Sequence, residues 1–514
     1  MRKIIYAALL AGLFTNSGCT KFLDVKPVGQ LIPTKVEDLE NLLNSNSTVE
    51  LFFVDNNRGS FYAHLGDNVR ISDNQAKYLF LNTNPNVERL AAYKFYYPYL
   101  DPNRSAVVWD GAIYKASGIF NVVIDEIGAL DAQDSDLGKM LTAQAKAGRA
   151  WSYMVGGLAY GPMYDPDAAN DTKVLPYRKT SSPNVPHPAL STTKEIISLV
   201  EQDLLESLNA PLHVANPSRA SLPAVHGLLA QLYMYKRDWA KMSQHADLAW
   251  SQALSAKGSV DNLIYNYKDF YYRPDENASP TPGTDVETVL DLQGPDNLHF
   301  QTNNREFLLF RTGPLGTNSY PSEEFLNLFD QANDRRYKLF ALKKLGYSTT
   351  VGGVRYNDGI QVHYMKDSKM ISNVGLTFPE LLLMKAEANA RTNKLTQALQ
   401  DLNLMRKYRY SGVSTDLPNG ASLSQDQLLY AILKERRREI PMASFQRVLD
   451  IKRLALDTGK PWSKDKIEHV IGGKVYSAAV KSKYFTLQIS NPIISFNPQW
   501  GLQPNTETYS PATF

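Results

Sequence analysis

Aromatic residues gather in two stretches of this sequence that also carry carboxylate, amide and guanidinium groups. The chain has 29 Tyr and 20 Phe in 514 residues. The residues that we expect to contact a ligand are Asp67, Asn68, Arg70, Tyr78, Tyr93, Tyr96, Tyr99, Tyr267, Tyr271 and Tyr272. An aromatic face can stack on the C–H patches of a sugar ring while polar neighbours bond its hydroxyls. Each ring could instead brace a loop against the core, and the sequence leaves open which stretch forms a site.

The sequence carries none of the common catalytic or metal-binding patterns. Its eight His are scattered, without HExxH or another paired spacing, and no GxSxG, GxGxxG or Walker loop occurs. Acid pairs such as Asp203 with Glu206 are more often solvated charges on a helix than the catalytic pair of a glycosidase. A catalytic pair is recognised by the distance between its carboxyl groups in space, which the sequence does not give. We therefore expect a protein that is not an enzyme, with no cofactor and no metal site.

Charge gives little support to a nucleic-acid partner. The formal net charge is +3, whereas nucleic-acid binding needs a clustered positive face. A basic run at Lys434–Glu439 contains Glu435 and Glu439 at helical spacing from its Arg and Lys residues. This pattern predicts a salt-bridged helix face.

The N-terminus has the order of a secretory signal. Arg2 and Lys3 precede an apolar run at 4–14, and two small residues stand directly before Cys19, the only cysteine. The apolar run is about half the length that crosses a bilayer. The small-small-Cys ending resembles the lipobox of bacterial lipoproteins, which predicts removal of residues 1–18 and lipidation of Cys19. The alternative is an ordinary signal peptide and a free thiol.

Hydrophobic periodicity predicts that helices position the two aromatic stretches. Helical signals occur at 36–43, 109–127, 137–160, 192–208, 217–250, 382–405, 425–440 and 448–454. The segments 217–250 and 382–405 have small residues at the spacing of tetratricopeptide hairpins, which lets two antiparallel helices approach. Residues 45–104 and 259–373 are expected to be mostly loop, with short strands at 286–292 and 306–310.

These signals predict a mainly α fold, a tetratricopeptide-like helical-hairpin scaffold with long irregular loops and a few short strands. We expect a single domain at 19–514 after the signal. Its expected parts are a loop-rich part at about 19–105, helical repeats at about 106–255 and 376–457, a loop-rich insert at about 259–375 and an extended tail at about 480–514.

Motifs spread along the chain resemble the SusD/RagB family of Bacteroidetes outer-membrane nutrient-uptake lipoproteins. The matching residues are Cys19, Leu23-Asp24, Pro27, Trp109, Tyr114, Asn121, Arg149-Ala150, Tyr153, Tyr160-Gly161-Pro162, Leu229-Ala230, Tyr233, Asp238-Trp239, Pro321-Ser322, Phe325, Asp334-Arg335-Arg336, Glu380, Ala386-Glu387-Ala388, Leu402-Asn403, Arg406, Glu435-Arg436-Arg437 and Glu439. Two positions depart from the family pattern. The usual Glu-Gly pair is missing before Arg447, and Phe95 stands where many members have Trp.

The resemblance implies a lipid-anchored protein of the outer membrane, facing the exterior. Such a protein would pack on a SusC-like TonB-dependent transporter, capture a glycan or oligosaccharide, and pass it inward. Some branches of the family bind peptides, so a peptide ligand is the first alternative. A tetratricopeptide-type adaptor that binds protein tails is the second.

Overall fold

The computed structural model describes residues 33–45, 48, 61–80, 86–104, 108–312 and 319–507. Cys19 and the expected signal at 1–18 lie outside these residues, so the cleavage and the lipid anchor remain predictions. Within the described part of the chain, no helix is both long enough and apolar enough to cross a bilayer.

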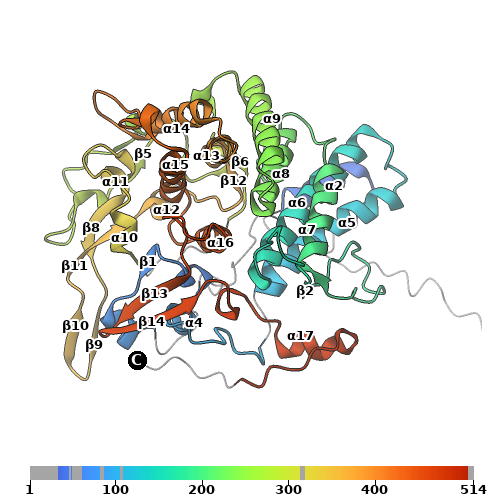
Figure 1. The fold of residues 1–514 in the computed structure, drawn as a ribbon, viewed down its shortest axis with the longest axis horizontal. Helices are drawn as coiled ribbons and strands as arrows, with labels where there is room; N and C mark the ends of the chain where they lie inside the picture. Colours follow the sequence, from blue (N-terminus) through green and yellow to red (C-terminus); the bar gives the residue numbers. More distant parts are fainter. Residues whose placement is uncertain are drawn as a thin grey trace, which may run out of the picture.

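Helices packed in pairs form the scaffold of the structure, as the sequence predicts (Figure 1). Helix α5 packs on α6, α6 on α7, α8 on α9, and α13 on α14, α15 and α9. The helices are α2 (Val36–Leu43), α4 (Asn86–Tyr93), α5 (Lys115–Ala129), α6 (Asp136–Tyr160), α7 (Thr193–Leu205), α8 (Leu222–Lys236), α9 (Trp239–Lys257), α10 (Glu323–Leu326), α11 (Arg335–Phe340), α12 (Lys366–Lys369), α13 (Phe378–Arg391), α14 (Leu395–Arg409), α15 (Gln425–Glu439), α16 (Phe445–Leu454) and α17 (Asn491–Phe496). The mainly α, hairpin-based fold class is therefore confirmed.

Local signals explain where several of these helices begin and turn. Thr192 caps α7 and Thr377 caps α13, each in a capping box with the Glu three residues later. Arg237 and Asn393 lie in the short turns between α8 and α9 and between α13 and α14, and both have a φ of +60°. A left-handed residue ends a helix and lets the chain reverse at once. The two tetratricopeptide-like hairpins therefore share the same kind of turn.

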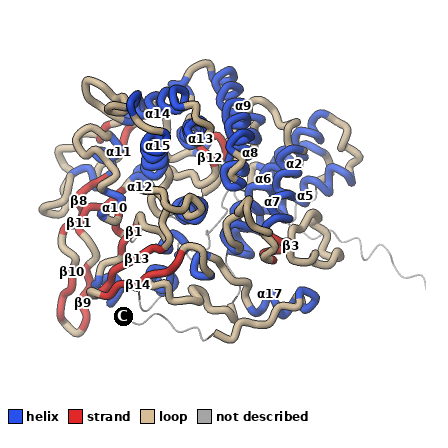
Figure 2. The backbone as a smooth tube through the Cα atoms, in the orientation of Figure 1, coloured by secondary structure: helices blue, strands red, loops and turns tan. Residues whose placement is uncertain are grey.

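The strands form two-stranded antiparallel pairs (Figure 2). They are β1 (Val69–Arg70), β2 (Lys173–Leu175), β3 (Ser191–Thr192), β4 (Tyr271–Tyr272), β5 (Leu292–Gln293), β6 (Phe307–Leu309), β7 (Tyr320–Pro321), β8 (Ala341–Leu345), β9 (Ser348–Val351), β10 (Val354–Asn357), β11 (Ile360–Tyr364), β12 (Leu376–Thr377), β13 (Lys466–Ile471) and β14 (Lys474–Ala479). Strand β8 pairs with β11, and β9 with β10, so residues 341–364 form one long ribbon that projects from the body.

Several sequence expectations are wrong in detail. The expected strand at 286–292 is a short 3₁₀ turn at Val286–Thr288, and only Leu292–Gln293 pairs, with β4. The ribbon at 341–364 lies in the insert, for which the sequence predicts mostly loop. The tail contains α17 rather than extended chain alone. In the N-terminal stretch, α4 makes regular helix of residues that were expected to be mostly loop.

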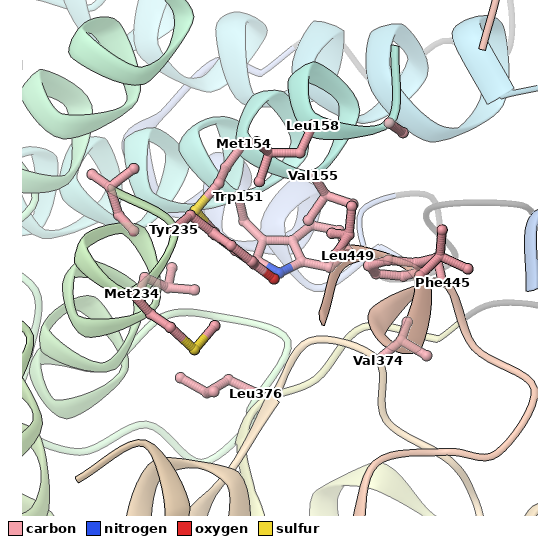
Figure 3. Packing of buried hydrophobic residues seen from close by; sticks show 14 of the residues in the cluster. Trp151, Met154, Val155, Leu158, Met234, Tyr235, Val374, Leu376, Phe445 and Leu449 are labelled. Carbon is pink, nitrogen blue, oxygen red and sulfur yellow. The ribbon is translucent and has the colours of Figure 1, made fainter. Parts of the chain in front are cut away.

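Two hydrophobic cores hold these elements. The larger runs through the helical pairs, and Figure 3 shows Trp151 of α6 among side chains of α6, α8 and α16. The smaller core contains Tyr265, Tyr267, Phe340 and Tyr364 of the insert, together with Val69 of β1. The N-terminal stretch and the insert therefore share one core, which places them side by side.

The basic run at Lys434–Glu439 forms the C-terminal end of α15. Its Glu435 and Glu439 form ion pairs, but these pairs are buried in the protein and do not lie on an exposed helix face. Arg336 of α11 contacts Asp334 at 2.7 Å and Glu439 at 3.0 Å, and also pairs with Glu435. Arg409 of α14 contacts Glu439 at 2.8 Å. Buried charges are tolerated when they are paired and hydrogen-bonded. This network joins the insert to the helical scaffold.

Candidate functional site

The N-terminal stretch meets the base of the ribbon through a short strand pair. Strand β1 runs antiparallel to β7, with Arg70 opposite Tyr320. The Arg70 guanidinium lies 4.9 Å above the Tyr320 ring, and its Nη2 donates to Oε1 of Gln361 on β11 at 2.8 Å. Arg70 is therefore positioned by two elements of the insert.

Polar contacts continue from β1 into the next turn. Ser72 Oγ donates to Oδ2 of Asp358 at 2.7 Å, and Asn74 Nδ2 donates to the Asn357 carbonyl at 3.1 Å. Tyr320 also donates its hydroxyl to Oδ2 of Asp358, at 2.7 Å. Asp358 thus links β7, the N-terminal stretch and the ribbon.

A pair of tyrosines lies beside these contacts. Tyr78, on the π-helical turn η3 (Gln75–Leu79), packs against Tyr356 of β10 with ring centroids 4.4 Å apart and planes inclined by 33°. Both side chains are half-buried. A hydrogen bond with Tyr78 raises the pKa of Tyr356 above its usual value. The Lys77 ammonium lies 5.2 Å from the Tyr78 ring.

These side chains form a polar surface with aromatic rings, to which two separate parts of the chain contribute. We call it the ribbon site and define it as Arg70, Asn74, Lys77, Tyr78, Tyr356 and Gln361. Its two rings can stack on a flat apolar patch, and its amide and guanidinium groups can bond hydroxyls around that patch. Among the described residues, no group of three or more His, Cys, Asp or Glu could hold a metal ion.

Two expected ligand residues, Asp67 and Asn68, are buried beneath this site. Asp67 contacts Arg447 at 2.7 Å, Arg437 at 3.1 Å and Lys464 at 2.6 Å. Burial opposes ionisation of Asp67, but these cations outweigh it and hold its pKa well below the usual value. Asn68 accepts from Nε of Arg437 at 2.7 Å. Both residues fasten β1 to α15 and α16.

The other tyrosines of the first stretch have different surroundings. Tyr93 is buried and stacks on His469 of β13, with centroids 4.0 Å apart. Tyr99 is buried and donates its hydroxyl to the Tyr484 carbonyl at 2.8 Å. Tyr96 is 43% exposed. Of the expected residues in this stretch, the structure brings Arg70 and Tyr78 together and leaves Tyr96 open to solvent.

The second stretch contributes mainly to the smaller core. Tyr267 is fully buried beneath the Arg409 guanidinium, 4.0 Å from its ring centroid. Tyr272 donates its hydroxyl to the Leu339 carbonyl at 2.5 Å. Tyr271 of β4 is 59% exposed.

Sequence reasoning missed Tyr356 and Gln361. Tyr356 follows the turn at Gly352 and Gly353, whose φ values are +57° and +80°. Gly-Gly between two runs of β-branched residues is a hairpin signal. That signal could have located the ribbon, though not its contact with Tyr78.

Comparison with known proteins identifies the fold. Residues 341–493 match the model of the SusD family. No curated protein matches the chain. The chain has the SusD fold. The resemblance to the SusD/RagB family is confirmed. The matched residues include the ribbon with Tyr356 and Gln361, whereas Arg70 and Tyr78 lie before the matched region.

Solved structures with the SusD fold match nearly the whole chain. A SusD superfamily protein from Bacteroides thetaiotaomicron VPI-5482 is 17% identical, with a TM-score of 0.62 over 90% of this chain and 98% of its own. A SusD-like carbohydrate binding protein from Bacteroides vulgatus ATCC 8482 is 17% identical, with a TM-score of 0.58 over 93% and 99%. A SusD superfamily protein from Bacteroides fragilis is 18% identical, with a TM-score of 0.61 over 91% and 99%.

Proposed function

We propose that this chain is a carbohydrate-binding protein without catalytic activity, and that the ribbon site holds the sugar. The observation that carries the proposal is the Tyr78–Tyr356 pair, with centroids 4.4 Å apart, beside Arg70 and Gln361. One of the similar solved structures is a SusD-like carbohydrate binding protein, which supports the same class of ligand.

The site suits a hydroxyl-rich ring. Nε and Nη1 of Arg70 donate to no residue of the described chain, so both remain available to ligand hydroxyls. The tyrosine rings supply an apolar face, and their positions are set before a ligand arrives by the strand pair and by the contacts of Asp358. A preorganised site spends less binding free energy on ordering its own side chains.

The ribbon site is tested by single tyrosine substitutions in the full chain. Affinity electrophoresis against a panel of polysaccharides, followed by calorimetry with matching oligosaccharides, measures binding. We expect Tyr356→Ala to weaken binding about tenfold, the equivalent of about 1.4 kcal/mol. Tyr271→Ala is the matched control, because Tyr271 is an exposed tyrosine outside the ribbon site.

The result also distinguishes the alternatives. Full affinity in Tyr356→Ala together with a loss in Tyr271→Ala or Tyr96→Ala would place the site elsewhere on the molecule. Binding of a peptide pool in the same calorimeter, with no response to any glycan, would replace the carbohydrate by a peptide ligand.

We further propose that the mature chain is tethered to the outer membrane through lipidated Cys19 and delivers its ligand to a SusC-like TonB-dependent transporter. Cys19→Ala should release the protein from the membrane fraction without changing its folding. Firm membrane attachment of that variant would contradict the anchor. A large outer-membrane barrel should co-purify with the wild-type protein, and its absence under mild detergent would contradict the partnership.

A further inference from the structure

A pocket is lined by residues of α5 and α17. These two helices lie on the side of the molecule away from the ribbon (Figure 1). The pocket has a volume of about 690 Å³ and lies between the start of the first helical pair, the loop at 176–187 and the C-terminal segment with α17. Pockets of this size hold small molecules. Its principal side chains are Trp109, Tyr114, Arg178, His187, Phe496 and Trp500, and we call it the tryptophan pocket.

Aromatic rings dominate its wall and are held in place. Trp109 lies 4.9 Å from Tyr114 and 6.1 Å from Trp500, measured between ring centroids. Tyr114 donates its hydroxyl to the Pro176 carbonyl at 2.7 Å, and Trp500 donates its indole N–H to the Pro188 carbonyl at 3.0 Å. Because these polar atoms already have protein partners, the rings present carbon surface to the pocket.

Phe496 is the exposed aromatic residue of this pocket. It ends α17 and its side chain is 85% exposed. A ligand that covers this ring would remove a large apolar surface from water, and this burial would contribute favourable binding free energy.

The polar groups of the pocket are also prearranged. Arg178 donates through Nε to the Thr180 carbonyl at 3.0 Å and also to the Ser182 carbonyl. Its Nη1 lies 3.1 Å from Nδ1 of His187. Since a guanidinium can only donate, Nδ1 of His187 must accept, and the ring proton is on Nε2. Partial burial and Arg178 lower the pKa of His187, so the ring is neutral at pH 7.

These observations define the kind of ligand. Nε2 of His187 donates to no residue within the described chain, so it can serve a ligand acceptor. Arg178 is the only charged side chain among the described residues that line the pocket. A wall of fixed rings with hydrogen-bond donors on Arg178 and His187 suits a ring that has C–H faces and hydroxyl edges.

We infer that the tryptophan pocket is a second carbohydrate site, which takes a neutral saccharide. The ligand class is that of the proposed function, but the pocket shares no residue with the ribbon site. Two separated sites on one chain would hold a polysaccharide by multivalency, where the second contact forms at a high effective concentration.

The experiment uses the full chain with the ribbon site removed by Tyr78→Ala and Tyr356→Ala. The probes are hexasaccharides of glucose, xylose and mannose, with an oligogalacturonide as the charged comparison. Calorimetry measures affinity, and tryptophan fluorescence, to which Trp109 and Trp500 contribute, is followed in parallel. We expect one neutral hexasaccharide to bind the ribbon variant and to change its tryptophan fluorescence.

Phe496→Ala and His187→Ala, each added to the ribbon variant, should lower that affinity about tenfold. Phe300→Ala is the matched control, because Phe300 is 57% exposed and lines neither site. Phe496 is almost free of packing, so its removal should leave folding intact, which circular dichroism checks.

Each outcome separates the two proposals. Sugar binding by the wild type that disappears entirely in the ribbon variant would overturn the second site and leave the ribbon site standing. Residual binding that Phe496→Ala and His187→Ala leave unchanged would also overturn it, as would a preference for the oligogalacturonide. Failure of the wild type to bind any glycan, with a response only to peptides, would overturn the proposed function and this inference together.

Discussion

Single residues of this protein show how much charge its interior holds. Asp334, Arg336 and Arg409 have no exposed surface, and Glu435 has 1% exposed at its side chain. Removing one partner from such a network leaves an uncompensated charge, which costs far more than breaking a surface pair. Protonation of the carboxylates in this network should therefore weaken the attachment of the insert to the scaffold.

Glu435 provides a test through pH. Burial favours its neutral form, but Arg336 and Arg438 outweigh burial and lower its pKa from 4.5 to about 2. A carboxyl whose pKa is lower in the folded state stabilises the fold fully above its unfolded pKa and loses that contribution as pH falls. We expect a loss on the order of 3 kcal/mol between about pH 4.5 and pH 2.

Urea unfolding at steps from pH 7 to pH 2 measures this contribution. Glu435→Gln should be less stable at pH 7, and its free energy of unfolding should depend less steeply on pH in the acid range. Parallel pH profiles for the wild type and Glu435→Gln would show that Glu435 has no such role.

Among the elements, the ribbon at 341–364 matters most to the proposed function. Its tip turns through Gly352 and Gly353, both in the left-handed region, and it carries Tyr356 back toward Tyr78. A Cβ at either glycine would meet no neighbouring atom within 4 Å, so only backbone strain opposes substitution. That strain is about 1–2 kcal/mol for each residue.

Replacing both turn glycines by alanine should therefore disturb the ribbon tip and weaken sugar binding, because Tyr356 is three residues from Gly353. Calorimetry with the best oligosaccharide measures the change, which we expect to be several-fold. Gly258→Ala is the control, since Gly258 follows α9 with a φ of +82° and also has open space around it. Equal affinity in the double glycine variant and the wild type would show that the tip does not position Tyr356.

The whole molecule is a helical scaffold. Ion pairs between side chains attach two irregular regions to it, the N-terminal stretch and the insert. Asp67 ties the N-terminal stretch to Arg447 of α16 and to Arg437 of α15, and Arg437 in turn contacts Glu324 of α10 at 2.6 Å. Helix α15 thus joins the N-terminal stretch and α10 of the insert to the helical core. Long-range contacts of this kind let loops hold a binding surface without disulfides.

Asp67→Asn tests this link. The variant leaves Arg447 and Arg437 without their shared carboxylate, so we expect a loss of about 3–5 kcal/mol in the free energy of unfolding. Hydrogen exchange of peptides that cover residues 61–80 should rise more than exchange in α6. Lys460→Met is the control, because the Lys460–Asp426 pair is about half exposed and should contribute less than about 1 kcal/mol. Unchanged exchange at 61–80 would contradict the anchoring role of Asp67.

The helical part of this protein could be predicted from the sequence because its signals are local. The helices at 36–43, 137–160 and 425–440 have periodic apolar residues within each segment, and the structure confirms them to within a residue. The paired charges of Lys434–Glu439 could be predicted for the same reason. Their burial could not, since the partners Asp334, Arg336 and Arg409 are remote in sequence.

Only the tertiary structure decided which aromatic residues remain on the surface. Tyr93, Tyr99 and Tyr78 all belong to the first aromatic stretch, but the first two meet β13 and the C-terminal tail and are buried there. Tyr78 meets the ribbon, more than 270 residues later in the chain, and stays half-open. Side-chain exposure depends on contacts between distant segments, and no local pattern in the sequence records them.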